Sequence, residues 1–299
     1  MISFKCKICG GELSFDTSGG LVCPYCGSKS FFDDSMLDSY KAFRKQMLDY
    51  LKSATDEKAE SADNFFLWDY CETASFQTAD GESVEIQYLF YSEEDDVKAF
   101  VARNSVVYVF KRKDANKAEK MRKNLLLLDY PSADTKDLKK CFPTIIHDTR
   151  LSDESTLIAI SKPENVYPLY AFGNLRYEHV AWIVSRLENI CCVLEYSDVI
   201  HGGITTDSVF INPHTHEGML YGNWWMARRK NPMEISRDLL DLRTVASKLL
   251  GPYQSAIPPL FASFLKHAPA NNAYDDFARW DDVIERGMGG HKFTKFSNS

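Results

Sequence analysis

The most constraining feature of the sequence is the stretch 201–228, HGGITTDSVFINPHTHEGMLYGNWWMAR, in which short apolar runs alternate with turn residues. Residues 208–212 and 219–222 are short and largely apolar, as expected of two β-strands, and the Pro- and Gly-containing segment 213–218 predicts the turn between them. Apolar residues at helical spacing predict a helix over 176–196, just before this stretch. The sequence therefore predicts a helix, a loop and a small hairpin, followed by Asn223-Trp224-Trp225.

This order and spacing resemble the active-site floor of protein kinases, where a catalytic loop H-R-D-L-x-x-x-N, a hairpin and the triplet D-F-G follow one another. In this resemblance His201 matches the motif His, and Gly203 stands at the catalytic Asp. Ser208 stands at the metal-binding Asn, and Asn223 at the metal-binding Asp. If the last strand is shifted by one residue, Gly222 takes the Asp position. The resemblance implies a kinase-like fold whose catalytic residues are replaced.

The charged groups left in this region are few. Thr205 stands where some kinases carry a loop Lys, and the nearest acid is Asp207. Asp207 has two interpretations: a displaced catalytic base, or a turn cap, because it follows two Thr residues. Kinases also cover the nucleotide phosphates with a Gly-rich loop. Here Gly81 is the only glycine between Gly27 and Gly173, so no such loop is expected.

Residues 64–168 are expected to form strands around one helix at 115–128, with later strands near 143–147 and 157–161. This order is similar to that of a kinase N-lobe. The similarity implies that Lys111 is the strand lysine that reaches the phosphates and that Glu119 is the helix glutamate paired with it. The alternative is that Lys111 ends a solvated strand and Glu119 is an exposed helix charge.

After the Trp pair, residues 238–250 predict a helix that ends at Gly251-Pro252. This helix resembles the central C-lobe helix of kinases, whose Asp accepts hydrogen bonds from the catalytic-loop backbone. Asp241 is the better match and Asp238 the alternative. Two further helices are expected over 258–266 and 275–285.

The N-terminus carries two C-x-x-C-G knuckles, with 13 residues between them. Their cysteines are Cys6, Cys9, Cys23 and Cys26. Four thiolates at these spacings can close a tetrahedral Zn²⁺ site, so a structural zinc ribbon is expected, with a redox dithiol or disulfides as the alternatives. Cys191 and Cys192 lie among apolar residues and are interpreted as core residues, with a redox-active vicinal pair as the alternative.

The expected organisation is α+β: a zinc ribbon (1–30), an amphipathic linker helix (31–63), a β-rich kinase-like N-lobe (64–168) and a short helical C-lobe (169–299). The net charge of −7 argues against a general nucleic-acid binder. No apolar run approaches the ~18 residues of a membrane span, and no secretory leader is recognisable. Paired CxxC motifs are typical of a reducing compartment, so a cytoplasmic location is expected.

Three functional hypotheses follow. The segment 177–182, YEHVAW, together with the His-Gly pair after the helix, resembles a group of degenerate kinase-like proteins of bacteria and phages. The first hypothesis is accordingly a pseudokinase that binds an unidentified protein partner. The second is a divergent nucleotide-dependent transferase that uses Lys111, Glu119 and Asp207. The third is a nucleic-acid adaptor docked by the zinc ribbon. Zn²⁺ is the expected cofactor, and the replaced site residues argue against ATP and Mg²⁺.

Overall fold

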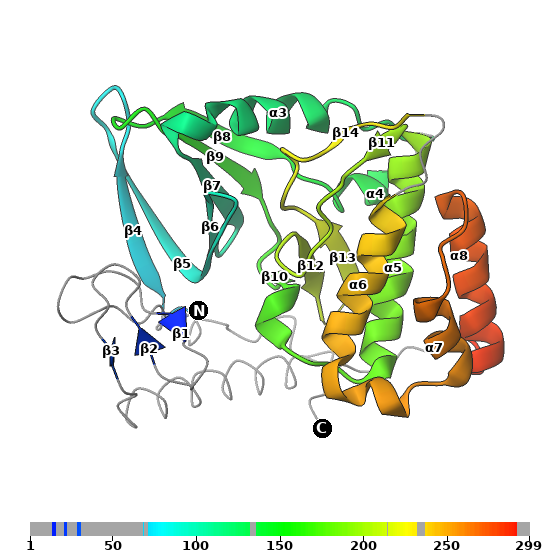
Figure 1. Cartoon of the computed structure of the whole chain (residues 1–299). Coiled ribbons are helices and arrows are strands. Elements are labelled where there is room, and N and C mark those ends of the chain that lie inside the picture. The colour runs from blue at the N-terminus through cyan, green and yellow to red at the C-terminus, as the bar shows by residue number, and fades with distance from the viewer. Residues whose placement is uncertain are drawn as a thin grey trace.

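The computed structural model describes residues 14–15, 21–22, 29–30, 68, 71–131, 136–213, 215–231 and 237–291. A curled antiparallel sheet forms one part of the molecule and a group of helices the other, with α3 (Ala115–Leu125) lying along the sheet (Figure 1). The fold is thus mixed α/β, as the sequence predicts. No helix among the described residues is long and apolar enough to cross a membrane.

The sheet has six strands in the order β4-β5-β6-β7-β9-β8, all antiparallel to their neighbours. Their bounds are β4 (Glu72–Gln77), β5 (Ser83–Glu94), β6 (Val97–Ala102), β7 (Ser105–Phe110), β8 (Ile145–Arg150) and β9 (Thr156–Ser161). The helix α3 follows β7 through a short 3-10 turn (Arg112–Asp114). The expected chain order, with strand pairs before one helix and two strands after it, is confirmed.

The sheet curls because its first and last strands meet at one end. Thr78, just after β4, forms a bridge with Leu151, just after β8. The Ala79 amide donates to the Arg150 carbonyl and the Ser152 amide to the Gln77 carbonyl, both at 2.8 Å. This contact makes the sheet a partly closed barrel. Both faces of β7 are consequently buried, since curling encloses the residues that a flat sheet would expose.

The two faces of β7 belong to different apolar clusters. Val107 and Val109 face the inside of the curl, where they join Phe100 and Leu157. Val106, Tyr108 and Phe110 face the other way, in the cluster that also contains the helical core. This alternation follows from the two-residue period of a strand.

The helical part is built on α5 (Tyr177–Tyr196), which packs against α6 and α8. The other elements are α4 (Lys136–Lys139), α6 (Arg237–Leu250), α7 (Pro259–Lys266), α8 (Ala273–Asp282) and a π-helical turn (Val283–Gly287), with 3-10 turns at Leu169–Phe172 and Gly251–Ala256. The helices expected at 176–196 and 238–250 are confirmed, each to within a residue.

The expected hairpin is also confirmed, as β12 (Val209–Asn212) and β13 (Glu217–Leu220), although β13 begins two residues before the predicted strand. On its other side β12 pairs with β10 (Tyr167–Pro168). A second small pair joins β11 (Val199–Ile200) to β14 (Arg228–Arg229). The β11–β14 pair thus holds the two ends of the stretch 201–228 next to each other.

The N-terminal strands β1 (Ser14–Phe15), β2 (Leu21–Val22) and β3 (Lys29–Ser30) form a small antiparallel sheet. Cys6, Cys9, Cys23 and Cys26 lie outside the described residues, as does the linker helix predicted within 31–63.

Candidate functional site

The loop that begins at His201 is held by the buried carboxylate of Asp238. Its two oxygens accept hydrogen bonds from the backbone amides of His201 (2.8 Å) and Gly202 (2.7 Å). Burial raises the pKa of Asp238 to about 6, against the opposing effect of these two amide bonds. The structure thus gives this anchoring role to Asp238, the alternative in the sequence analysis.

Asp241, the preferred match, lies one helical turn further along α6. It is half-buried, pairs with Arg237 at 3.7 Å and accepts a bond from the Ile204 backbone. Residues i and i+3 share a face of a helix, so both acids reach the loop. Asp238 binds the first two amides because it is the completely buried one. The expectation for Asp241 is corrected accordingly.

His201 is a structural residue in this arrangement. Its ring is completely buried and packs edge-on against Trp224, with ring centroids 5.0 Å apart. Its Nε2 lies 2.9 Å from the Gly222 carbonyl oxygen, which can only accept, so Nε2 carries the proton. Burial lowers the pKa of His201 to about 4, which keeps the ring neutral at pH 7.

Gly203, which the sequence resemblance matches with the kinase catalytic Asp, lies in close contact with the side chains of Met226 and Asn223. A Cβ atom built on Gly203 would lie 2.8 Å from the Met226 Sδ and 3.0 Å from the Asn223 Cβ. Asn223 has a positive φ of 60° and donates from Nδ2 to the Gly203 carbonyl oxygen at 3.1 Å. A side chain at residue 203 would therefore require the exposed Met226 side chain to move and Asn223 to shift slightly.

Ser208 and Gly222, which the sequence resemblance and its shifted alignment match with metal-binding residues of kinases, are held in local contacts. The Ser208 hydroxyl accepts from the Thr205 amide (2.8 Å) and donates to the Thr205 carbonyl (3.2 Å), so it completes a turn. A Cβ at Gly222 would lie 2.7 Å from the Ser208 Cα. That contact excludes a side chain at residue 222 in this backbone, including the carboxylate required by the shifted alignment.

One group of charged residues remains next to this loop. Asp207 is half-buried beside Lys248, whose Nζ donates to the Thr206 hydroxyl at 3.1 Å. Burial raises the pKa of Asp207, and Lys248 partly offsets this rise. Glu94, from the end of β5, approaches from the sheet and accepts from Asn223 Nδ2 at 3.4 Å. Burial also raises the pKa of Glu94, with further contributions from nearby Asp207 and Asp95.

Sequence reasoning missed Glu94, which is 129 residues away from Asn223 in the chain. The available signal was the run Glu93-Glu94-Asp95-Asp96. Asp95 and Asp96 both adopt positive φ, 53° and 63°, as the two central residues of a type I′ hairpin turn do, so the turn itself explains these two acids but not Glu93 and Glu94, which end β5.

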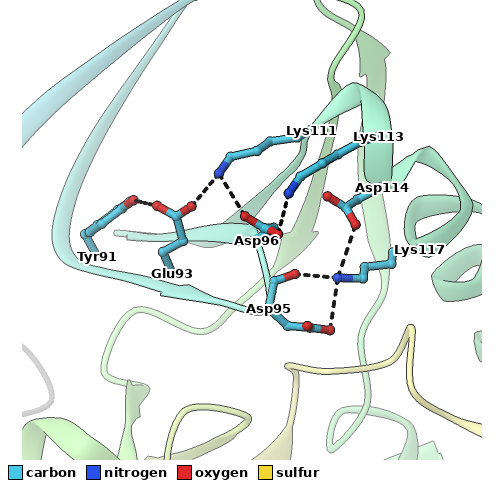
Figure 2. A network of polar contacts seen from close by, with 8 residues as sticks. All are labelled: Tyr91, Glu93, Asp95, Asp96, Lys111, Lys113, Asp114 and Lys117. Atoms are coloured by element: carbon cyan, nitrogen blue, oxygen red, sulfur yellow. Dashed lines mark hydrogen bonds and ion pairs between the residues drawn. The ribbon is translucent and has the colours of Figure 1, made fainter. Parts of the chain in front are cut away.

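Lysines hold this acidic tip against the start of α3 (Figure 2). Lys111 bonds Glu93 at 2.7 Å and Asp96 at 3.2 Å, and Lys113 bonds Asp96 at 2.6 Å. Lys117 bonds Asp95 at 2.9 Å. The tip is therefore neutralised from the outside of the molecule.

Lys111 and Glu119 do not form the predicted ion pair with each other, because each has other partners. Lys111 follows Phe110, whose side chain faces the core, so strand alternation sends the lysine to the outside. Glu119 lies on the exposed face of α3 and pairs with Lys123 (3.1 Å) and Arg122 (3.4 Å). The interpretation as exposed surface charges is the one that fits the structure.

Aromatic rings fill the space between the sheet and the loop. Trp225 packs edge-on against Tyr108 and Phe110 of β7, at centroid distances of 5.8 and 5.4 Å. Trp224 packs against Phe142 at 5.9 Å, and its indole donates to the Leu220 carbonyl at 2.9 Å. The strand positions that face the loop thus carry rings and no amine.

Asn124 of α3 binds the backbone of this aromatic segment. Its Nδ2 donates to the carbonyl oxygens of Trp224 (2.9 Å) and Ala227 (2.6 Å). One side chain of the sheet half therefore fixes the backbone of residues 224–227.

In the part of the chain that the structure describes, no three His, Cys, Asp or Glu side chains are grouped so as to hold a metal. Its four cysteines are free thiols. Burial raises the pKa of Cys191 far above its usual range and that of Cys192 to about 12. Thiolates are the reactive form, so the core interpretation of this vicinal pair fits better than the redox one.

No protein-family model and no curated protein matches the sequence. Among solved structures, WbdD in complex with the kinase inhibitor LY294002 has a TM-score of 0.47 and 11% identity, covering 70% of this chain and 47% of WbdD. Vaccinia related kinase 3 has a TM-score of 0.44 and 15% identity, covering 81% and 84%. A Toxoplasma gondii specific rhoptry antigen kinase domain has a TM-score of 0.48 and 10% identity, covering 73% and 87%.

The chain spans less than half of WbdD. Because every one of these TM-scores lies below 0.5, neither a family nor an activity is inferred from them.

Replacing Asp238 with Ala should destabilise the protein by about 2–4 kcal/mol, because it leaves two buried amides without an acceptor. Asp241→Ala should cost only about 1 kcal/mol, because that residue is half-buried and its partner Arg237 is exposed. Denaturant unfolding of both variants measures the difference. Equal losses would contradict the assignment of the anchor to Asp238.

Proposed function

We propose that this chain is a kinase-shaped protein that does not transfer phosphate and that acts as a binding module for another protein. The observation that carries the proposal is that residue 203 is a glycine with no carboxylate, whose carbonyl oxygen accepts a hydrogen bond from Asn223 at 3.1 Å. An Asp at this place accepts the proton of the attacking hydroxyl in kinases. Gly203 supplies no such group, and the nearest acid in the loop is Asp207.

The remaining parts of the kinase mechanism also lack their residues. Kinases hold two Mg²⁺ ions with an Asp and an Asn, and hard cations of this kind depend on anionic oxygen ligands. Ser208 and Asn223 supply a hydroxyl and an amide, and both are already engaged in local hydrogen bonds. Tyr108 and Phe110 of β7 are buried against Trp225 and carry no amine that could bind a phosphate.

The acidic hairpin tip adds an electrostatic obstacle. Kinases cover the phosphates with bare backbone amides from a Gly-rich loop. Glu94 instead brings a carboxylate to Asn223, and Asp95 adds negative charge beside it. Because the lysines of Figure 2 already bond the other acids of the tip, they offer little compensation to an incoming polyphosphate.

A second candidate function is a divergent nucleotide-dependent transferase. One observation favours it: Asp207, Glu94 and Lys248 gather beside the loop, and burial raises the pKa of both acids. Perturbed carboxylates of this kind also occur at catalytic sites. We rank it second because a base alone does not place phosphates, and the groups that would do so are missing from the described loop.

A thermal melt with 5 mM ATP, with and without Mg²⁺ or Mn²⁺, tests the proposal. A site occupied at about 100 times its Kd would stabilise the folded state by about 2.7 kcal/mol and raise the Tm by several degrees. We expect no metal-dependent shift. A clear shift that is lost in Asp207→Asn would instead favour the transferase. Glu119→Gln serves as the control, because that acid lies on the exposed face of α3.

We also propose that Cys6, Cys9, Cys23 and Cys26 hold a structural Zn²⁺ ion. The support is their spacing together with the small N-terminal sheet: Cys23 directly follows β2, and the second knuckle joins β2 to β3. Such a short segment needs metal binding to supply its folding energy.

Replacing Cys6 and Cys23 with Ser should abolish stoichiometric zinc in metal analysis of the purified protein, while the rest of the chain keeps its Tm. Cys71→Ser, which changes a thiol outside the knuckles, should keep the metal. Zinc retained in the double variant would disprove the site.

A further inference from the structure

The helix α5 borders two neighbouring cavities on the helical part, which together are called the α5 groove. The larger, about 590 Å³, lies between α5 and α8, and the smaller, about 340 Å³, lies between α5, the α4 region and the start of β13. Arg186 and Asn189 line both cavities and so mark the place where they meet. Figure 1 shows α5 with α8 on one side and β13 close by. The groove is separate from the loop at His201 and from the hairpin tip.

One face of α5 forms the floor of this groove. Residues of the floor recur at helical spacing, from Tyr177 through Trp182, Ser185 and Asn189 to Val193. Sixteen helical steps of 1.5 Å give a length of about 24 Å. An extended peptide rises about 3.3 Å per residue, so the groove has the length of about seven residues. A site of this length suits a peptide segment better than a compact metabolite.

The two cavities have the character of separate side-chain pockets. In the larger, Trp182 stacks flat on His216 with ring centroids 4.4 Å apart, and Phe277 lines the same cavity from α8. The smaller is lined by Phe142, Ile190 and other apolar side chains. The floor positions 182 and 190 are about 12 Å apart along the helix, which corresponds to about four residues of extended peptide.

The side chains that line the α5 groove carry more negative than positive charge, which favours binding of a basic segment. Four carboxylates face the groove, against two cations. The carboxylates are Asp137, Glu178, Glu217 and Asp281, and the cations are Lys140 and Arg186. Lys140 is bound to Glu217 at 2.6 Å, and Arg186 donates to the His216 carbonyl at 2.6 Å.

Two of the acids have exposed partners at the rim. Glu178 pairs with Arg176 at 2.9 Å and Asp281 with His291 at 2.8 Å, where the side chains of Arg176 and His291 are 44% and 61% exposed. Exposed pairs of this kind contribute little to stability. A peptide Lys or Arg can replace either of them at small cost.

We propose that the α5 groove binds an extended basic segment of a partner protein, with two apolar side chains four residues apart and at least one Lys or Arg. The proposal rests on the proposed function as a binding module and gives that module a specific surface. It does not depend on whether ATP binds near the loop at His201. The ATP melt can therefore contradict the proposed function while peptide binding to the groove is still observed, and the reverse is also true.

The test is selection of a random heptapeptide display library on the full chain, followed by fluorescence-polarisation binding of the synthesised consensus peptide. We expect a consensus with apolar residues four apart and a Lys or Arg. Asn189→Tyr, which fills the junction of the two cavities, should weaken its binding at least tenfold. Lys123→Tyr, on the exposed side of α3, is the matched control and should bind as the wild type does.

Reversing the charge of one groove carboxylate provides a second test of the proposal. Asp281→Lys should also weaken binding at least tenfold, whereas Asp282→Lys should not, because Asp282 is not among the groove residues and pairs with Arg286 outside. Failure to enrich any sequence, an acidic consensus, or equal binding by Asn189→Tyr with an unchanged Tm would each overturn the proposal.

Discussion

The packing of Trp224 and Trp225 between the sheet and the helices is the interaction on which the rest of the described structure depends. Trp225 contacts Tyr108 and Phe110, on the face of β7 that lies outside the curl, and Trp224 contacts His201 and Phe142. Both indoles belong to one apolar cluster that runs from the sheet through α5, α6 and α8. Two such large side chains bury enough apolar surface to join the two parts of the molecule into a single core.

This packing also determines what the loop at His201 can do. Because Trp224 is fixed by Asn124 and the Leu220 carbonyl, Asn223 and Met226 on either side of the Trp pair are held over Gly203. The Asp238 carboxylate holds the start of the loop by accepting hydrogen bonds from two backbone amides. No carboxylate projects from residue 203 of this loop, and a binding role is therefore the function that we propose.

Local sequence pattern was enough to predict the helix over 176–196 and the hairpin that follows the loop at His201. Periodicity and turn residues are short-range signals, and the structure follows them. The choice between Asp238 and Asp241 was beyond the sequence, because two acids three residues apart share one helical face and only burial separates them. Two interpretations of Lys111 stayed open, because the end of β7, and with it the side of the sheet on which Lys111 lies, cannot be located to a single residue from the sequence.

Long-range contacts explain the remaining differences. The approach of Glu94 to Asn223 and the bridge between Thr78 and Leu151 join segments with no shared local signal. Curling of the sheet through that bridge was not predicted, because each strand in it looks like an ordinary half-buried strand. The groove along α5 could not be predicted from the sequence either, since its walls come from four separate segments of the chain.

The most direct test of the central claim is phosphate turnover by the purified full chain. Release and transfer of the γ-phosphate of ATP, followed over hours with Mg²⁺ and with Mn²⁺, should not exceed the rate in buffer, because residue 203 supplies no carboxylate to accept the hydroxyl proton. A rate well above buffer that disappears in Asp207→Asn would contradict the account and would make Asp207 a catalytic base.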